Sequence, residues 1–361
     1  MKSWKKMKSW KKNWSVYYFL IWACIALLAP ILANQVEPNQ IIQPLVPYSQ
    51  SSIDYENSNS VSPFDSQLIE SNYYRHWLGT DELGRDVLSQ LIHGSRTAFI
   101  IGFGVILLAG IIGILLGGIA GYFGDHSLMV GKQKLLTGLA VLPFYILFVT
   151  TVIPWNISTV SAIQKLMLLS LFSLVYLLIV FLAGKIKTQT KAKIQLPIDL
   201  VISRIIELID AIPLLFLLVC LTAIIEPSFF TTILIIASVA WTSIAKYTRG
   251  EIIKVRNENY IQSAKALAFN NFQILRKHIL PNALGPVLVS LSFGMAAAIL
   301  LEASLSFLGM GISAEEASWG KLIAAARNNY QAWWLAIFPG LAIFITVVAS
   351  NKLSELFQKK I

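Results

Sequence analysis

Charged residues and cysteines are both scarce in this sequence. Only 13% of the 361 residues are Asp, Glu, Lys or Arg, whereas 56% are hydrophobic, and the mean hydropathy is +0.65. This balance excludes an ordinary soluble domain and indicates an integral membrane protein. The two cysteines, Cys24 and Cys220, lie within apolar runs. Their positions argue against a structural disulfide and against a paired-cysteine zinc site.

Catalytic and phosphate-binding motifs are also missing. The sequence contains no HExxH, GxSxG or GxxxxGK pattern, so the chain is not expected to hydrolyse ATP alone. The four histidines, His76, His93, His126 and His278, are dispersed, and we assign no metal site to them. We therefore expect no catalytic residue and no cofactor in this chain.

Long apolar runs are abundant, and each of eight is long enough to cross a bilayer as a helix of roughly 17 to 25 residues. The runs lie near 16–33, 98–121, 135–153, 166–184, 205–225, 229–246, 285–308 and 333–350.

The net charge of +10 is distributed unevenly between the segments that join these runs. If the N-terminus is cytoplasmic, the inside segments hold most of the Lys and Arg, and the long outside segment 34–97 is acidic. The positive-inside rule then predicts that both termini are cytoplasmic. Topology and anionic lipid headgroups account for the basic charge, so we expect no nucleic-acid partner.

The stretch "HWLGTDELGRDVLSQLIHG" at 76–94 is the most patterned polar segment. Thr80 is a good N-cap, acids occupy the first turn, and Gly94 can end a helix. The apolar residues repeat at four-residue spacing. We therefore predict a short amphipathic helix over 81–93, lying on the outer membrane surface within an extracytoplasmic segment 34–95.

The next apolar run has small residues at every fourth position: Ala109, Gly113, Gly117 and Gly121. This spacing leaves one helix face almost bare of side chains, so another helix is expected to pack closely against it. The spacing does not say whether that helix belongs to this chain or to a partner subunit.

Polar residues inside two other apolar runs are candidates for a functional role. Glu302 lies in "AAAILLEASLSFLGMG", where a charge costs roughly 2.5 to 3.5 kcal/mol on insertion scales, so it should be paired, protonated or near water. With Ser304 and Ser306 it could line a translocation path, although structural pairing fits the pattern as well. Near the inner end of another run, Glu207 and Asp210 are expected to cap a helix or to pair with Arg204.

The cytoplasmic segment 247–284 contains two amphipathic stretches separated by Asn270 and Asn271. We predict two short helices with a turn, ending where Pro281 restricts Leu280 away from helical geometry. The segment is either a connector lying on the membrane or a platform for a cytoplasmic partner, and the pattern favours the platform.

Within this segment, "YIQSAKALAFNNFQILRKHILPN" resembles the cytoplasmic EAA loop of permease subunits in bacterial ABC importers. Gln262 stands where that family usually has an acid, Ser263 where it has Ala, and Ala268 where it has Gly. The resemblance implies an ATPase-coupling loop formed by Tyr260, Gln262, Ser263, Ala264, Ala268, His278, Ile279, Leu280 and Pro281.

Other landmarks narrow the resemblance to the C-type permeases of dipeptide, oligopeptide and nickel importers. They are the 76–94 stretch, "GYFGD", "ILLEASLSFLGMG", "SWGKLI" and "WWLAIFPGLAIF", in the family's order. The fold implied is an all-α type I ABC importer transmembrane domain with a MetI-like core and about eight spans. We expect a first anchor over 1–33, a transmembrane domain over 96–361, and an inserted two-helix hairpin over 132–198.

The function implied is half of a translocation path for small peptides in a bacterial inner membrane. The partners implied are a second permease, two ATP-binding subunits that hold the ATP and Mg, and an extracytoplasmic substrate-binding protein. Two alternatives remain: an importer of nickel or another small solute, and a degenerate scaffold that docks an ATPase. An intramembrane enzyme would need a polar mate for Glu302, and the sequence offers no evident one.

Overall fold

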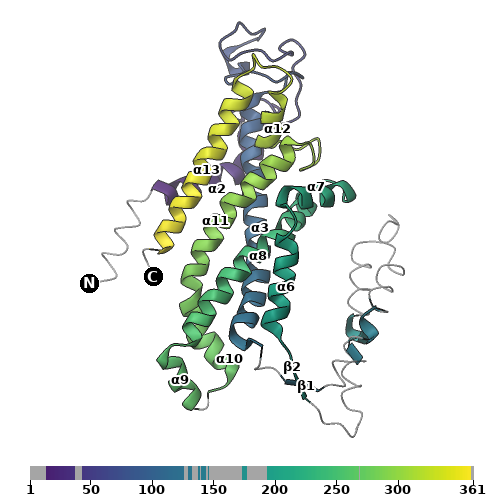
Figure 1. Ribbon diagram of the computed structural model, residues 1–361. Helices are drawn as coiled ribbons and strands as arrows, with labels where there is room; N and C mark the ends of the chain where they lie inside the picture. The colour runs from purple at the N-terminus through teal and green to yellow at the C-terminus, as the bar shows by residue number, and fades with distance from the viewer. Residues whose placement is uncertain are drawn as a thin grey trace, which may run out of the picture. The chain divides into compact units, whose positions relative to one another are not determined.

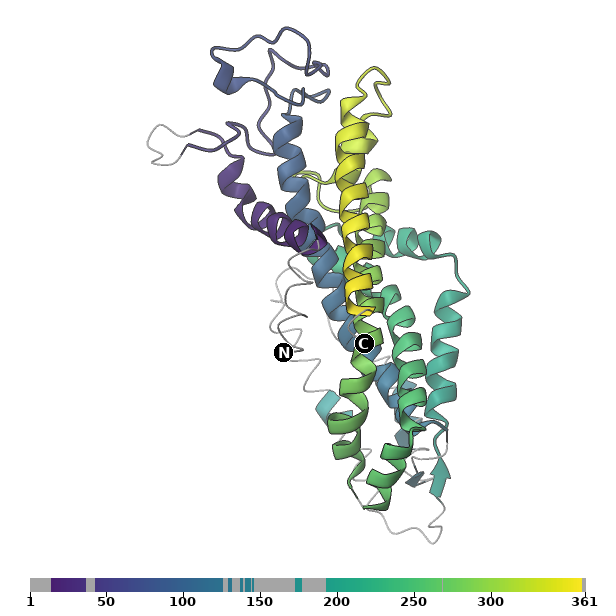
Figure 2. The same ribbon diagram turned by 90° about the vertical axis from the view of Figure 1, so that its left-hand side faces the viewer.

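The computed structural model shows a mostly helical chain that divides into two compact units (Figures 1 and 2). One unit combines residues up to Tyr122 with residues from Ser203 onward, and the other covers Phe123–Ile202. The structure describes residues 14–36, 43–125, 129–131, 137–138, 140–143, 145, 173–176, 193–267 and 269–358.

Helices account for nearly all of the regular structure in the described residues. In chain order the named elements are α2 (Trp14–Leu32), η1 (Asn72–Tyr74), α3 (Val87–Phe123), β1 (Met129–Gly131), β2 (Lys193–Gln195), α6 (Ile198–Asp210), α7 (Leu214–Ile224), α8 (Phe229–Arg256), α9 (Asn259–Ala266), α10 (Asn271–Ile274), η2 (Leu275–Ile279), α11 (Leu280–Phe307), α12 (Trp319–Ala325) and α13 (Trp334–Gln358).

Five of the described helices are long and apolar enough to cross a membrane: α2, α3, α8, α11 together with the preceding η2 turn, and α13. A sixth span is possible if α6 and α7 form one broken span, because they pass the same test together. The predicted all-helical membrane fold is confirmed. The count of eight spans stays a prediction, since most of the two runs at 135–153 and 166–184 lies outside the described residues.

The predicted helix over 81–93 is wrong in its bounds. Residues 81–86 form a turn closed by a bridge between Thr80 and Asp86, and α3 begins at Val87. Asp86 supplies the cap, since its Oδ2 accepts from the Ser89 N–H at 2.7 Å. The helix then continues through Gly94, whose missing side chain makes room for Trp319: a Cβ there would lie 2.7 Å from the Trp319 ring. There is therefore one long helix where the pattern predicted two.

The small-residue face of α3 packs against α8 within the same chain. A Cβ on Gly117 would lie 2.3 Å from the carbonyl oxygen of Ala245, and one on Gly121 would lie 2.8 Å from that of Arg249. Gly113 meets Ile244 and the Trp241 carbonyl in the same way, and Ala109 is fully buried. The question left open by the spacing is answered: this face is an internal helix contact.

In the unit formed by residues 123–202, two short strands pair antiparallel, with Val130 opposite Ile194. The Asp125 carboxylate accepts from the Leu200 N–H in the first turn of α6 at 2.9 Å. These contacts join the two ends of the predicted insert 132–198. The hairpin itself lies almost entirely outside the described residues.

The core of the larger unit is densest where α11 and α13 lie side by side with α3 and α12 (Figures 1 and 2). Trp22 of α2 stacks on Trp319, and the Tyr18 hydroxyl bonds Thr346 of α13. The first predicted anchor is thus part of the packed bundle.

Candidate functional site

The span formed by α6 and α7 is broken, and the break creates the most prominent irregular feature of the larger unit. The two helix axes meet at 84° across residues 211–213. Pro213 precedes α7 with ψ of 123°, and because it has no N–H it cannot continue the hydrogen-bond ladder of α6. The break leaves the carboxyl end of α6, and with it Asp210, facing the space between helices.

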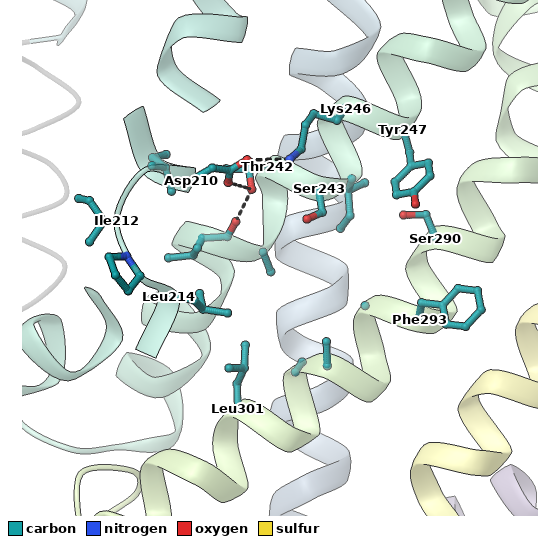
Figure 3. A pocket seen from close by; sticks show the side chains of 18 residues that line it. Asp210, Ile212, Leu214, Thr242, Ser243, Lys246, Tyr247, Ser290, Phe293 and Leu301 are labelled. Carbon is teal, nitrogen blue, oxygen red and sulfur yellow. Dashed lines mark hydrogen bonds and ion pairs between the residues drawn. The ribbon is translucent and has the colours of Figure 1, made fainter. Parts of the chain in front are cut away.

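A cavity of about 510 Å³ opens at this break, between the α6–α7 corner, α8 and α11 (Figure 3). Its lining residues are Ile209, Asp210, Ile212, Pro213, Leu214, Val239, Ala240, Thr242, Ser243, Ile244, Lys246, Tyr247, Ser290, Phe293, Gly294, Ala297, Ala298 and Leu301.

An ion pair crosses the cavity wall between α6 and α8. The Lys246 ammonium lies 2.6 Å from Asp210 Oδ2, and the Thr242 hydroxyl donates to Oδ1 of the same carboxylate at 3.1 Å. The two charged side chains are 53% and 37% exposed in this chain, so neither is sealed in the protein. The predicted pairing with Arg204 is confirmed for Glu207, one turn earlier on α6, and wrong for Asp210, which pairs with Lys246.

Both charges belong to segments that qualify as membrane spans. Both lie toward the predicted cytoplasmic ends of the apolar runs given above. Ionisable groups within spanning segments normally face a bundle interior or a water-filled cavity, where they mark a solute or ion path. Broken spans also mark such paths, because the helix ends at the break carry backbone groups that are not paired within the helix and can face a solute. The sequence did hold a signal for Lys246, since it is the first charge in the apolar run that begins near 229.

The cavity has a polar side and an apolar side. The hydroxyl groups of Ser243, Tyr247 and Ser290 also line the cavity, and those of Tyr247 and Ser290 point toward one another (Figure 3). Leu214 and Leu301 lie across from them. Such a wall suits a small solute that carries charge and hydrogen-bonding groups along an apolar body.

Glu302, the charge singled out in the sequence, does not line this cavity. It is 1% exposed and its Oε1 accepts from the hydroxyls of Ser306 and Ser318, at 2.8 and 2.7 Å. Ser318 in turn caps α12 by accepting from the Gly320 N–H at 3.1 Å. The polar partner of Glu302 that the sequence did not reveal is therefore Ser318, sixteen residues away. The hydrogen bonds among Glu302, Ser306 and Ser318 hold α12 against α11.

Ser304, the remaining candidate of that group, donates its hydroxyl to the Leu300 carbonyl in its own helix, at 2.7 Å. It does not line the cavity either. The polar wall therefore comes from α6 and α8 and from an earlier part of α11 than the sequence suggested.

The predicted coupling loop forms two short helices, α9 and α10, as expected, but it does not end at Pro281. Leu280 has helical dihedral angles of −57° and −47°, and the chain runs from α10 through the wide turn η2 directly into α11. Proline is tolerated in the first turn of a helix. The wider π-type turn over 275–279 also relieves the clash that its ring would make with the carbonyl four residues earlier.

One face of this loop is buried and the other is exposed. Ile261, Ile274 and Ile279 are fully buried, and Ala264 is 5% exposed. Gln262 and Ser263 face outward, where the Ser263 hydroxyl donates only to the Asn259 carbonyl of its own helix. Ala268 lies outside the described residues.

The remaining loop residues hold the two ends of the loop together. The Asn282 side-chain amide donates to the Tyr260 hydroxyl at 3.1 Å and to the His278 carbonyl at 2.6 Å. The His278 ring stacks on Phe269, with 6.1 Å between centroids. These contacts join the start of α9 to the start of α11, so the loop can move with α11 as one piece.

Two further contacts connect the loop region to the end of α3. The Tyr122 hydroxyl donates to the Asn271 side-chain oxygen at 2.9 Å, and Arg256 donates to the Tyr122 carbonyl at 2.8 Å. Since α3 packs along α8 through its glycine face, the loop region is tied by direct contacts to both helices. The α8 helix carries both Lys246 of the cavity and Arg256 beside the loop, so one helix connects the two regions.

A second cluster of opposite charges lies in the 43–86 region. Both ring nitrogens of the fully buried His76 face carboxylates: Nδ1 lies 2.9 Å from Asp86 and Nε2 lies 3.1 Å from Asp54. Each nitrogen can satisfy an acceptor only by carrying a proton, so the geometry calls for the charged imidazolium. Although burial lowers the pKa of His76, the hydrogen bonds and charges of Asp86 and Asp54 outweigh it and raise that pKa.

These features define the class of the protein: a multi-pass helical membrane protein with a cavity at a broken span and an anchored loop at the ends of its helices. The chain matches the family "binding-protein-dependent transport system inner membrane component" over residues 181–361. It belongs to that family. It is an inner-membrane permease component of an ABC transport system.

Individual relatives match a longer part of the chain. The dipeptide transport system permease protein DppC of Alkalihalophilus pseudofirmus is 29% identical over 80% of this chain and 72% of its own length. DppC of Bacillus subtilis is 27% identical over 78% and 67%, and the probable D,D-dipeptide transport system permease DdpC of Escherichia coli is 29% identical over 76% and 69%. The C-type resemblance drawn from the sequence motifs is confirmed.

Proposed function

We propose that this chain is one of two permease subunits in an ATP-driven importer of small peptides. An extracytoplasmic binding protein delivers the peptide, this chain and a second permease enclose the path, and two ATP-binding subunits drive it. The observation that carries the proposal is the ion pair of Asp210 and Lys246 on a cavity wall at a broken membrane span. The names of the relatives, which are dipeptide permeases, support the same substrate class.

The chemistry of the cavity favours peptides over a metal ion. Asp210 is the one acidic residue among the described lining residues, which include no His, Cys or Met. The Lys246 ammonium lies 2.6 Å from that carboxylate and would repel a divalent cation. Ni²⁺ prefers imidazole and other nitrogen or oxygen ligands in a defined geometry, which this wall does not offer. A peptide, with charged termini and a less polar body, fits it better.

The mechanism we propose is alternating access driven from the 259–282 loop. ATP binding in the partner subunits closes their dimer against the exposed face of α9, at Gln262 and Ser263. The buried face of the loop and the contacts of Tyr122 pass that movement to α3, α8 and α11. Those helices carry the cavity wall, so the cavity opens to one side of the membrane and then to the other. In this topology both termini and the loop are cytoplasmic.

The scaffold alternative keeps one argument in its favour. Gln262 removes the acidic charge that the family usually places on the docking face, and a neutral side chain there weakens any ion pair with an ATPase. If docking survives without movement, the chain would hold an ATPase but transport nothing. Replacing Gln262 with Glu and Ala268 with Gly, followed by peptide uptake, separates the two: a large gain in uptake would favour a degenerate subunit.

The experiment that tests the proposal is affinity purification of the tagged full chain from its native membrane in mild detergent, with mass spectrometry of the bound proteins. A second permease and two ATP-binding subunits are the expected partners. Gln262→Arg should lose the ATP-binding subunits while keeping the second permease, because it places a bulky charge on the docking face. Gln358→Arg, the same change at an exposed position of α13, serves as the control and should keep all of them.

Peptide uptake completes that experiment. Cells that lack the chain should fail to accumulate a labelled dipeptide, and the wild-type chain and Gln358→Arg should restore accumulation. Recovery of the chain alone, or uptake that does not depend on the chain, would contradict the proposed function.

A further inference from the structure

The Asp210–Lys246 ion pair is accessible enough for each side chain to exchange its partner for a charged group of a solute. Lys246 and Asp210 are 53% and 37% exposed, and both line the cavity, so a solute in the cavity can reach each charge without unfolding anything around it. The Asp210 carboxylate keeps the Thr242 hydroxyl as a second partner at 3.1 Å, which would hold it in place if Lys246 moved away. The cluster around His76, by contrast, is enclosed and has no such access.

Exchange would also conserve charge. When the cavity is empty, the two side chains neutralise one another within a membrane-spanning part of the chain, where an unpaired charge is costly. A zwitterionic solute brings one positive and one negative group of its own, so two new ion pairs can replace the old one with no net charge gained. Solutes with a single charge would leave Asp210 or Lys246 without a partner.

The surroundings of the pair fit the rest of a peptide. The hydroxyls of Ser243, Tyr247 and Ser290 can bond peptide amides, and the leucines across the cavity can contact an apolar side chain (Figure 3). We propose that Asp210 and Lys246 are the charge-selective contacts of the translocation path: Asp210 receives the cationic groups of a passing peptide, those of its side chains included, and Lys246 receives the anionic ones. This inference rests on the proposed function and deepens it by assigning the residues that sense peptide charge.

The test is competitive uptake of two labelled dipeptides, Ala-Lys and Ala-Glu, by cells carrying the full transport system. The measured quantity is the ratio of basic to acidic dipeptide accumulated, normalised to the wild-type ratio. Because the binding protein is the same in every strain, its own preference cancels in this comparison.

Single neutralisations should shift the ratio in opposite directions. Asp210→Asn leaves Lys246 alone and should lower the basic-to-acidic ratio, whereas Lys246→Met leaves Asp210 alone and should raise it. We expect a shift of about twofold to fivefold each way, the scale of one half-exposed charge interaction. The control pair is Lys352 and Glu355 on α13, which is exposed to a similar degree at 50% and 48%. Lys352→Met and Glu355→Gln should leave the ratio unchanged.

A second set of variants leaves the Asp210–Lys246 ion pair intact, so it tests the proposal even if the single neutralisations disturb folding. Ser243 is exposed on the same wall of α8, so Ser243→Asp should raise the ratio and Ser243→Lys should lower it without breaking the Asp210–Lys246 contact. Recovery of the ATP-binding subunits with each variant measures assembly independently of uptake.

Each outcome decides one of the two proposals. Opposite shifts in the single variants, repeated by the Ser243 variants, would support the assigned contacts. Lower uptake of both dipeptides at an unchanged ratio would overturn this inference and leave the proposed function standing, since the pair would then be structural. A wild-type chain that assembles with its partners but accumulates neither dipeptide would overturn the proposed function, and this inference with it.

Discussion

The two clusters of opposite charge in this chain differ in how completely the protein encloses them. His76 is fully buried between Asp86, which is 1% exposed, and Asp54, which is 20% exposed, whereas Lys246 and Asp210 face a cavity with roughly half of their surface exposed. Enclosure fixes the first cluster in one arrangement and makes its partners irreplaceable. Access lets the second cluster trade partners with a solute. Similar chemistry thus serves structure in one place and transport in the other.

The largest expected difference between the clusters is in stability. His76→Ala should lower the free energy of unfolding by about 3–5 kcal/mol, because it leaves two carboxylates facing one another in a buried site. Lys246→Met should lower it by about 1 kcal/mol at most, since the half-exposed pair is screened by solvent. Thermal unfolding of the two purified variants in the same detergent measures both. Equal losses would erase the distinction drawn between enclosed and accessible charge.

The position of α8, which carries Lys246 on the cavity wall, should depend on its close packing against the glycine face of α3. Gly117→Val should destabilise the protein by about 2–3 kcal/mol and reduce uptake, because its side chain would meet the Ala245 backbone, which cannot move aside. Gly118→Ala is the matched control: its Cβ would lie 3.6 Å from Ile252, an ordinary contact, and should be tolerated. Unfolding curves of the two variants provide the measurement. A tolerated valine at 117 would show that α3 and α8 are not in close contact.

The enclosed carboxyl group of Glu302 offers an intermediate case. Glu302→Ala should cost about 2 kcal/mol of stability, because the Ser306 and Ser318 hydroxyls lose a shared acceptor and α12 loses its tie to α11. Glu302→Gln keeps an oxygen at the same position and should cost less than half as much. Neither change should alter the ratio of basic to acidic dipeptide taken up, since Glu302 does not line the cavity. An altered ratio in Glu302→Gln would place this residue on the path after all.

The smallest expected effect is a pH dependence confined to the His76 cluster. The pKa of His76 is raised in the folded chain from its ordinary value of 6.5, so its contribution to stability is complete below that value and is lost as the pH rises through the folded pKa. Asp54 acts in the opposite sense: burial opposes the shift, but the bonds from Asn57 and His76 lower its pKa, so its contribution fades only in acid.

Limited proteolysis of the 43–86 region is the measurement for this dependence. We expect faster cleavage at pH 9 than at pH 6 in the wild type and no such difference in His76→Gln, whose side chain does not titrate. A cleavage rate that is independent of pH in the wild type would mean that the charge state of His76 does not hold this region.

Much of the fold could be predicted from residue patterns with a local cause. Apolar runs of bilayer length located the described spans, and four-residue spacing identified the glycine face of α3. The two short helices of the coupling loop followed from the periodicity of apolar residues on either side of Asn270. Each of these features is decided within one or two turns of the chain, where sequence spacing and spatial proximity coincide.

Features that depend on distant partners could not be predicted in the same way. Asp210 and Lys246 are thirty-six positions apart, and only the packing of α6 against α8 brings them together. Glu302 finds Ser318 through the return of the chain between α11 and α12. The start of α3 at Val87 depends on a bridge between Thr80 and Asp86 that competes with local helix propensity. At Pro281 the π-type turn, which no local rule anticipates, removed the expected break.

The central claim is that accessible charge in the cavity senses the peptide while enclosed charge does not. The most direct test is the basic-to-acidic dipeptide uptake ratio of Asp210→Asn measured beside that of Asp54→Asn, two identical changes at carboxylates that each face a cationic side chain. The account predicts a lower ratio for Asp210→Asn and an unchanged ratio for Asp54→Asn, whatever the total uptake of each. An equal ratio in both variants would contradict it.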